Sequence, residues 1–149
     1  TNYYHRFKII QILAAKFKNL TNLYYKEASK ETPLVSLNPD KGLLIIDGNC
    51  NSETPDEFFE EITDWIASYS KEPKDITTLT INLGGINISS SKYLLNIIYQ
   101  LESIQKNGNK VKIRWVCKNG EDGNYELGKD YSEMASVPFE FVEEFVSKI

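Results

Sequence analysis

Residues 80–92, Thr-Ile-Asn-Leu-Gly-Gly-Ile-Asn-Ile-Ser-Ser-Ser-Lys, decide how this chain folds. A strand-like run, residues 77–83, enters this stretch, and a helix with apolar residues at every third or fourth position, residues 93–104, leaves it. The stretch therefore predicts a strand that turns directly into a helix. Its hydroxyl side chains would lie at the helix N-terminus, where free backbone N–H groups and the helix dipole favour negative charge.

Three consecutive serines, Ser89, Ser90 and Ser91, allow two interpretations of this junction. Ser89 or Ser90 can cap the helix through its side-chain oxygen. One cap needs only one hydroxyl, however, and the first helical turn contains Lys92 and no Asp or Glu. A phosphate would bring about two negative charges to unpaired N–H groups beside a lysine. Residues 87–92 are therefore either a helix cap or a phosphorylation switch.

Two strands and one helix are predicted before the junction. Residues 34–47 form a hairpin around the turn sequence Asn-Pro-Asp-Lys-Gly at residues 38–42. A helix begins where Thr54 can act as the cap and Pro55 can take the first helical position. Its apolar face continues to a stop at Pro73.

The segments after the junction complete a sheet. The second helix ends at residues 106–108, Lys-Asn-Gly, and residues 110–117 alternate between apolar and charged side chains, as in a strand with one face in water. Residues 118–130 are predicted as loop and 131–135 as a helical turn. Residues 139–145 are predicted as a last strand, either alone or followed by a short helix. The order β-β-α-β-α-β-β predicts an α/β protein with a mixed sheet and flanking helices, because strands joined through helices pair in parallel.

The first 30 residues differ from the rest in charge. Residues 1–30 hold six Lys or Arg and one Glu. Residues 31–149 hold eleven Lys or Arg and twenty Asp or Glu. Apolar residues at near-heptad spacing over residues 3–25 predict a helix. We therefore predict a basic amphipathic helix in 1–30 and an α/β domain in 31–149. The helix can pack on its own domain, pair two copies into a homodimer, bind a membrane surface or act as a linker.

Composition excludes several classes of function. The acidic domain argues against nucleic-acid binding. No apolar run reaches the roughly 18 residues of a membrane span and no signal peptide is evident, so we expect a cytoplasmic protein. The single histidine, His5, is remote from the other polar groups, so we expect neither an enzyme nor a cofactor. Cys50 and Cys117 lack metal spacing and the carboxylates of 118–130 lack the calcium-loop pattern, so we expect reduced thiols and no metal.

Several segments resemble the SiaC-type regulatory phosphoproteins. Asn87-Ile88-Ser89-Ser90-Ser91-Lys92 resembles the Asn-Thr-Ser-Ser-Ser-Lys motif of that family. Residues 39–48 are similar to its Gly-Leu-hydrophobic segment, and residues 53–59 to the Pro-Glu-Asn-Pro-x-Glu-Phe-Phe start of its helix. Residues 108–115 are similar to its Gly-x-x-Val-x-hydrophobic-x-Trp strand. The resemblance extends over residues 31–145 and leaves the N-terminal segment outside.

This resemblance implies a STAS-like fold, as in anti-sigma-factor antagonists, and a function without catalysis. Members of the family are switches that a Ser/Thr kinase phosphorylates and a PPM-type phosphatase resets. Their dephosphorylated form binds a partner protein, which in such systems can be a diguanylate cyclase that controls biofilm formation. The resemblance makes residues 87–92 the regulatory junction and, together with Glu53, the partner-binding surface.

This chain departs from the family motif at its phosphorylated threonine, which is replaced by Ile88. Because isoleucine has no hydroxyl, either a neighbouring serine accepts the phosphate, Ser89 first and Ser90 second, or the switch is lost. Residues 50–53, Cys-Asn-Ser-Glu, also replace the family's Ser-Tyr-Pro-Glu. Two hypotheses follow: a binding protein controlled by phosphorylation, and a phosphorylation-independent structural or dimerisation module.

Overall fold

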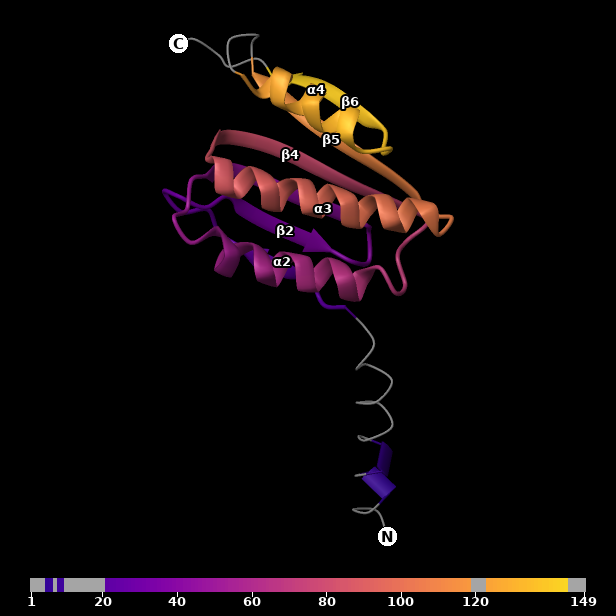
Figure 1. The fold of residues 1–149 in the computed structure, drawn as a ribbon. Helices are drawn as coiled ribbons and strands as arrows, with labels where there is room; N and C mark the ends of the chain where they lie inside the picture. The colour runs from indigo at the N-terminus through magenta and orange to yellow at the C-terminus, as the bar shows by residue number, and fades with distance from the viewer. Residues whose placement is uncertain (1–4, 7, 10–20, 119–122, 145–149) are drawn as a thin grey trace.

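The computed structural model describes residues 5, 6, 8, 9, 21–118 and 123–144 (Figure 1). Strands and helices alternate along most of this length, in the order β1 (Tyr24–Lys26), β2 (Leu34–Asn38), β3 (Leu43–Cys50), α2 (Pro55–Tyr69), β4 (Ile76–Ile86), α3 (Ile88–Lys106), β5 (Lys110–Lys118), α4 (Asn124–Met134) and β6 (Phe139–Glu144). The prediction of an α/β fold with a mixed sheet and flanking helices is confirmed.

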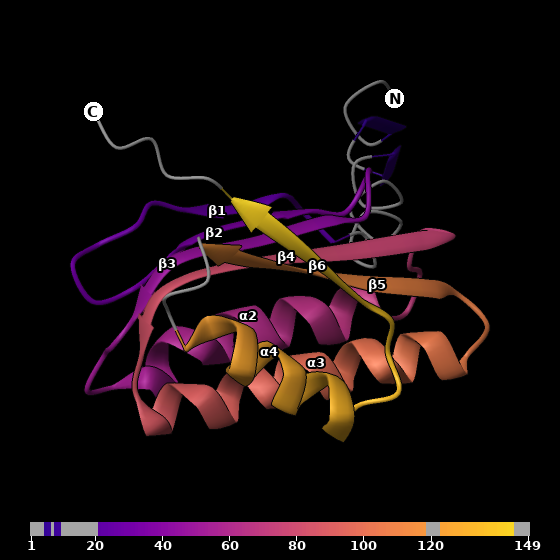
Figure 2. The same cartoon turned by 90° about the horizontal axis from the view of Figure 1, so that it is seen from above.

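The six strands form one sheet whose spatial order, β1-β2-β3-β4-β5-β6, follows the sequence. β1, β2 and β3 pair antiparallel, whereas β3, β4, β5 and β6 pair in parallel. Each parallel connection passes through a helix. Figure 2 shows α2, α3 and α4 on the same face of the sheet, so the described domain has two layers.

The hydrophobic core lies between the sheet and this helical layer. Alternate strand residues point into it and are at most 1% exposed, namely Val35, Leu37, Leu44, Ile46, Leu79, Ile81, Leu83, Ile113 and Trp115. They pack against similarly buried side chains of the helices, namely Phe59, Ile62 and Ile66 of α2 and Leu94, Ile97, Ile98 and Leu101 of α3. Lys110 and Lys112 on the opposite face of β5 are exposed, as the alternation of residues 110–117 predicts.

The basic helix predicted for residues 3–25 lies mostly outside the described residues. Residues 5, 6, 8 and 9 have helical backbone but are too few to define a helix, and no N-terminal helix is seen among the described residues. The last part of the prediction is wrong, because Tyr24–Lys26 form strand β1. Tyr24 pairs with Leu37, a partner that helical spacing within the segment does not reveal. β1 lies before the predicted domain boundary at residue 31.

The loop predicted for residues 118–130 is a second difference, because residues from Asn124 onward form α4. Gly128, in the middle of this helix, weakens the helical pattern of the sequence. The structure shows why a glycine is there: a Cβ at residue 128 would come within 2.6 Å of the Trp115 indole nitrogen. α4 packs on Trp115 and provides the crossover that makes β6 parallel to β5.

α2 begins at Pro55, as predicted, but Thr54 makes no capping hydrogen bond through its side chain. The backbone N–H of Thr54 instead donates to Ser52 Oγ at 3.1 Å. The hydroxyl pattern that predicts a cap at this position therefore belongs to a local turn before the helix.

Candidate functional site at the strand–helix junction

The predicted junction lies where β4 passes into α3. β4 ends at Ile86 and α3 begins at Ile88, so that Asn87 alone separates the two elements. This position is at the carboxyl ends of the parallel strands, the end of an α/β sheet where binding sites usually form. The fold thus presents residues 87–92 at the end of the domain.

Asn87 holds the junction through its side chain and its backbone. Oδ1 accepts a hydrogen bond from the Ser90 N–H at 2.8 Å, and Nδ2 donates to the Ser52 carbonyl at 2.9 Å. The Asn87 N–H donates to the Cys50 carbonyl, and the Asn87 carbonyl accepts from the Ser91 N–H, both at 3.0 Å. One residue therefore caps α3 and ties it to the loop that follows β3.

The three serines occupy different environments, and none of them is the cap. The prediction that Ser89 or Ser90 caps α3 is wrong, because Asn87 takes that position. Ser90 is 1% exposed, and its hydroxyl has no hydrogen-bond partner among the described residues. Ser91 Oγ donates to the Ile88 carbonyl at 2.6 Å. Ser89 is the one serine of the three whose side chain is exposed.

Ile88 is 80% exposed at the first position of α3, so its side chain contributes little to the core. Lys92, one turn further along the same helix, is also exposed, and the first turn of α3 contains no acidic residue. The hydrogen bond from Asn87 to Ser52 brings the neighbouring Glu53, which is exposed, to the same end of the domain. The surface of the junction thus combines an aliphatic group, a hydroxyl, a lysine and a carboxylate.

Two glycines just before the junction lie against asparagine side chains at the end of β3 and in the loop after it. A Cβ at Gly84 would collide with the side-chain oxygen of Asn49, and a Cβ at Gly85 would lie 3.1 Å from Asn51 Nδ2. The glycines of the opening stretch therefore leave space for the side chains of Asn49 and Asn51.

α4 supports the junction from the opposite side, through residues that the sequence does not single out. Asn124 Nδ2 donates to the Leu83 carbonyl at 2.8 Å, and Tyr131 Oη donates to the Ser91 carbonyl at 2.9 Å. Burial raises the pKa of Tyr131 to about 12, so its hydroxyl stays protonated and available as a donor. A helix prediction for residues 124–134 would have been needed to find these contacts.

The comparison with protein families identifies the domain. The family model described as SiaC family regulatory phosphoprotein matches residues 26–144. The chain belongs to the SiaC family of regulatory phosphoproteins. The match begins at the last residue of β1 and ends at the last residue of β6, so it covers the whole parallel part of the sheet and the junction.

Relatives of this SiaC-family chain come from Pseudomonas aeruginosa. An uncharacterised protein of strain UCBPP-PA14 is 26% identical over 111 residues, which are 74% of this chain and 88% of the relative. The structure of apo-SiaC has a TM-score of 0.74 at 24% identity, over 81% of this chain and 98% of that chain. SiaC bound as activator to the diguanylate cyclase SiaD has a TM-score of 0.76, over 81% and 99% of the two chains.

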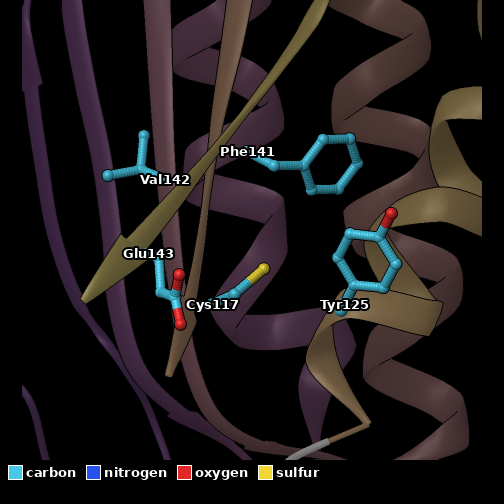
Figure 3. Close-up of a pocket in the computed structure, with 5 residues that line it drawn as sticks. All are labelled: Cys117, Tyr125, Phe141, Val142 and Glu143. Carbon is cyan, nitrogen blue, oxygen red and sulfur yellow. The ribbon is translucent and has the colours of Figure 1, made fainter. Parts of the chain in front are cut away.

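A pocket of about 290 Å³ lies away from the junction, between α4 and the edge strand β6 (Figure 3). Figure 3 shows Cys117, Phe141 and Tyr125 pointing into the same space, and the two ring centroids are 5.4 Å apart. Val142 and Glu143 complete the lining, and no residue of the junction takes part.

The described residues offer no group of three or more His, Cys, Asp or Glu side chains that is placed to hold a metal ion. No helix among them is long and apolar enough to cross a membrane. In this SiaC-family domain, the exposed Ile88, Ser89 and Lys92 of the junction form the candidate functional surface.

Proposed function

We propose that this chain is a non-enzymatic bacterial signalling protein of the cytoplasm that binds a partner protein through its junction surface, which we define as Glu53 and residues 87–92. The exposed Ile88, on a backbone held by the hydrogen bonds of Asn87, carries the proposal. An aliphatic side chain on a rigid backbone loses little conformational entropy on binding and can fill an apolar pocket of the partner.

The partner that we propose is a diguanylate cyclase. Support comes from the solved relative, SiaC of Pseudomonas aeruginosa, which is described as the activator of the diguanylate cyclase SiaD. Lys92 beside Ile88 would favour an acidic rim around the apolar pocket of the cyclase, because complementary charges speed association and orient the partner.

A Ser/Thr kinase and a PPM-type phosphatase would control this binding. Ile88 cannot accept a phosphate, and Ser90 is 1% exposed, whereas Ser89 is exposed. We therefore propose Ser89 as the acceptor. A phosphate at Ser89 would place about two negative charges at the α3 N-terminus, where Lys92 and the helix dipole stabilise it. The added negative charge would repel the acidic rim of the partner and end binding.

The test combines phosphorylation with binding. The protein is incubated with its cognate kinase and ATP, and the phosphate is located by mass spectrometry in the wild type, Ser89→Ala and Ser90→Ala. We expect phosphate on Ser89 in the wild type and in Ser90→Ala, and none in Ser89→Ala. Binding to the cyclase should weaken by at least about tenfold in Ile88→Ala if Ile88 is an anchor residue of the interface, because such residues carry most of the binding energy.

The outcomes separate the two hypotheses from the sequence. If residues 87–92 carry no phosphate but Ile88→Ala still weakens binding, the chain binds its partner independently of phosphorylation. If Ile88→Ala binds as tightly as the wild type, the junction is not the docking surface. A pull-down that recovers only further copies of the chain, with a dimer in light scattering, would support a structural or dimerisation module instead.

A further inference from the structure

Residues 21–26 lie as an extended segment along the side of α2, and we call this segment the strap. The strap runs antiparallel to α2 and contacts it about once per helical turn. The contacts are Thr21 Oγ1 with Ser68 Oγ at 2.9 Å, Trp65 Nε1 donating to the Asn22 carbonyl at 2.6 Å, Tyr24 Oη donating to Glu61 Oε2 at 2.7 Å, and Lys26 Nζ at 5.3 Å from the centroid of the Phe58 ring.

The other side of the strap pairs with the sheet. Residues Tyr24, Tyr25 and Lys26 form the antiparallel edge strand β1, in register with Leu37, Ser36 and Val35 of β2. The strap therefore fills a groove that has one wall from α2 and one from the backbone of β2. We call this the α2–β2 groove and define it by Phe58, Glu61, Trp65, Ser68 and strand β2.

The groove carries recognition groups of its own. The Trp65 ring is 9% exposed, and its indole N–H meets a backbone carbonyl, which any extended peptide can supply. Glu61 accepts a hydroxyl, and the Phe58 ring lies under an ammonium group. β2 offers the N–H and C=O groups of a strand edge. A peptide that contacts Trp65, Glu61, Phe58 and the β2 edge together needs a tyrosine followed two residues later by a lysine or arginine.

Both walls of the groove belong to the family domain. The family match begins at residue 26, so residues 21–25 precede it. The α2 wall and strand β2 lie wholly within the matched residues.

The chain is anchored again just after the strap. Asn49 Nδ2 donates to the Lys30 carbonyl at 3.3 Å, and the Asn51 N–H donates to the Glu31 carbonyl at 2.9 Å. Residues 27–31 between the strap and β2 are exposed. These contacts lie outside the strap, so they do not depend on its place in the groove.

We propose that the α2–β2 groove is a strand-accepting site, and that residues 21–26 occupy it as a replaceable ligand within the same chain. The external ligand of the groove is an extended segment of a partner protein that carries the Tyr-x-Lys pattern. This segment pairs with β2 as the edge strand of the sheet. This second surface, at the β1 edge of the sheet, goes beyond the partner binding proposed for the junction.

The experiment uses the full chain and a fluorescent peptide of residues 20–28. One variant, Thr21→Cys with Ser68→Cys, locks the strap by a disulfide between positions whose hydroxyl oxygens lie 2.9 Å apart. A second variant, Tyr24→Ser, weakens the strap and leaves every groove residue intact. Fluorescence anisotropy should show peptide binding to Tyr24→Ser at least about tenfold tighter than to the wild type, and none to the locked protein.

A control peptide carrying Phe in place of Tyr24 tests the recognition chemistry. It should bind Tyr24→Ser about tenfold more weakly, because it cannot donate to Glu61. The proposal is overturned if folded Tyr24→Ser does not bind the peptide, or if the locked protein binds it equally well. Failure of Tyr24→Ser to fold, judged by circular dichroism, would also overturn it, since the strap would then be an integral part of the fold.

Discussion

Replacing Asn87 by alanine should lower the free energy of unfolding by about 2 kcal/mol, because one side chain holds both halves of the junction. The substitution removes the Oδ1 acceptor of the Ser90 N–H and the Nδ2 donor to the Ser52 carbonyl. Loss of an N-cap costs about 1 kcal/mol, and loss of one further hydrogen bond costs about 1 kcal/mol. Both hydrogen bonds are partly buried, so water replaces them only in part.

Two matched variants separate these contributions. Asn87→Asp keeps the acceptor at the helix N-terminus and loses the donor, so it should cost about 1 kcal/mol or less. Asn96→Ala, at an exposed position of α3, changes only helix propensity and should leave the stability unchanged or raise it slightly.

Urea unfolding followed by tryptophan fluorescence measures the differences, since Trp65 and Trp115 are both buried. In thermal unfolding, about 2 kcal/mol corresponds to a Tm lower by about 4–8 °C for a chain of this size. Equal stabilities of Asn87→Ala and Asn96→Ala would refute the role of Asn87 in the junction. A loss in Asn87→Asp as large as that in Asn87→Ala would refute the assignment of the cap to Oδ1.

Two further predictions concern α4 and the core. Gly128→Ala should destabilise the protein by about 1–3 kcal/mol in urea unfolding, because the new Cβ would lie 2.6 Å from the Trp115 indole. A stability equal to or above that of the wild type would contradict the close packing of α4 on Trp115. Burial raises the pKa of Cys50 from 9.0 to about 12, so its thiol favours folding below pH 9, and this contribution is lost as the pH rises toward 12. The stability of the wild type should therefore fall more steeply above pH 9 than that of Cys50→Ala, and parallel pH profiles would contradict the prediction.

Elements whose signal is local could be predicted from the sequence. The hairpin of β2 and β3 follows from a turn sequence between two apolar runs, and α2 follows from Pro55 and an apolar face of helical period. The junction follows from a strand pattern that runs into a helix pattern with no room for a loop. In each case the deciding interactions join residues that are close in the chain.

Elements whose signal is distant could not be predicted. β1 depends on pairing with β2 and on contacts with α2, about 40 residues further along the chain. α4 contains Gly128, which local propensity disfavours in a helix. A larger residue there would collide with the indole of Trp115, which lies nine residues before Asn124. Long-range packing outweighed local preference in both elements.

The same division applies to the candidate site. The sequence by itself determined that residues 87–92 form a strand-to-helix junction with spare hydroxyls, because capping chemistry and hydrophobic period are written in neighbouring residues. Only the tertiary structure decided which polar group caps α3 and which serine is exposed. The Ser52 carbonyl and the packing of α4 come from other parts of the chain, and together they make Asn87 the cap and leave Ile88 and Ser89 at the surface. Burial is set by the neighbours that folding brings together, which a local pattern does not contain.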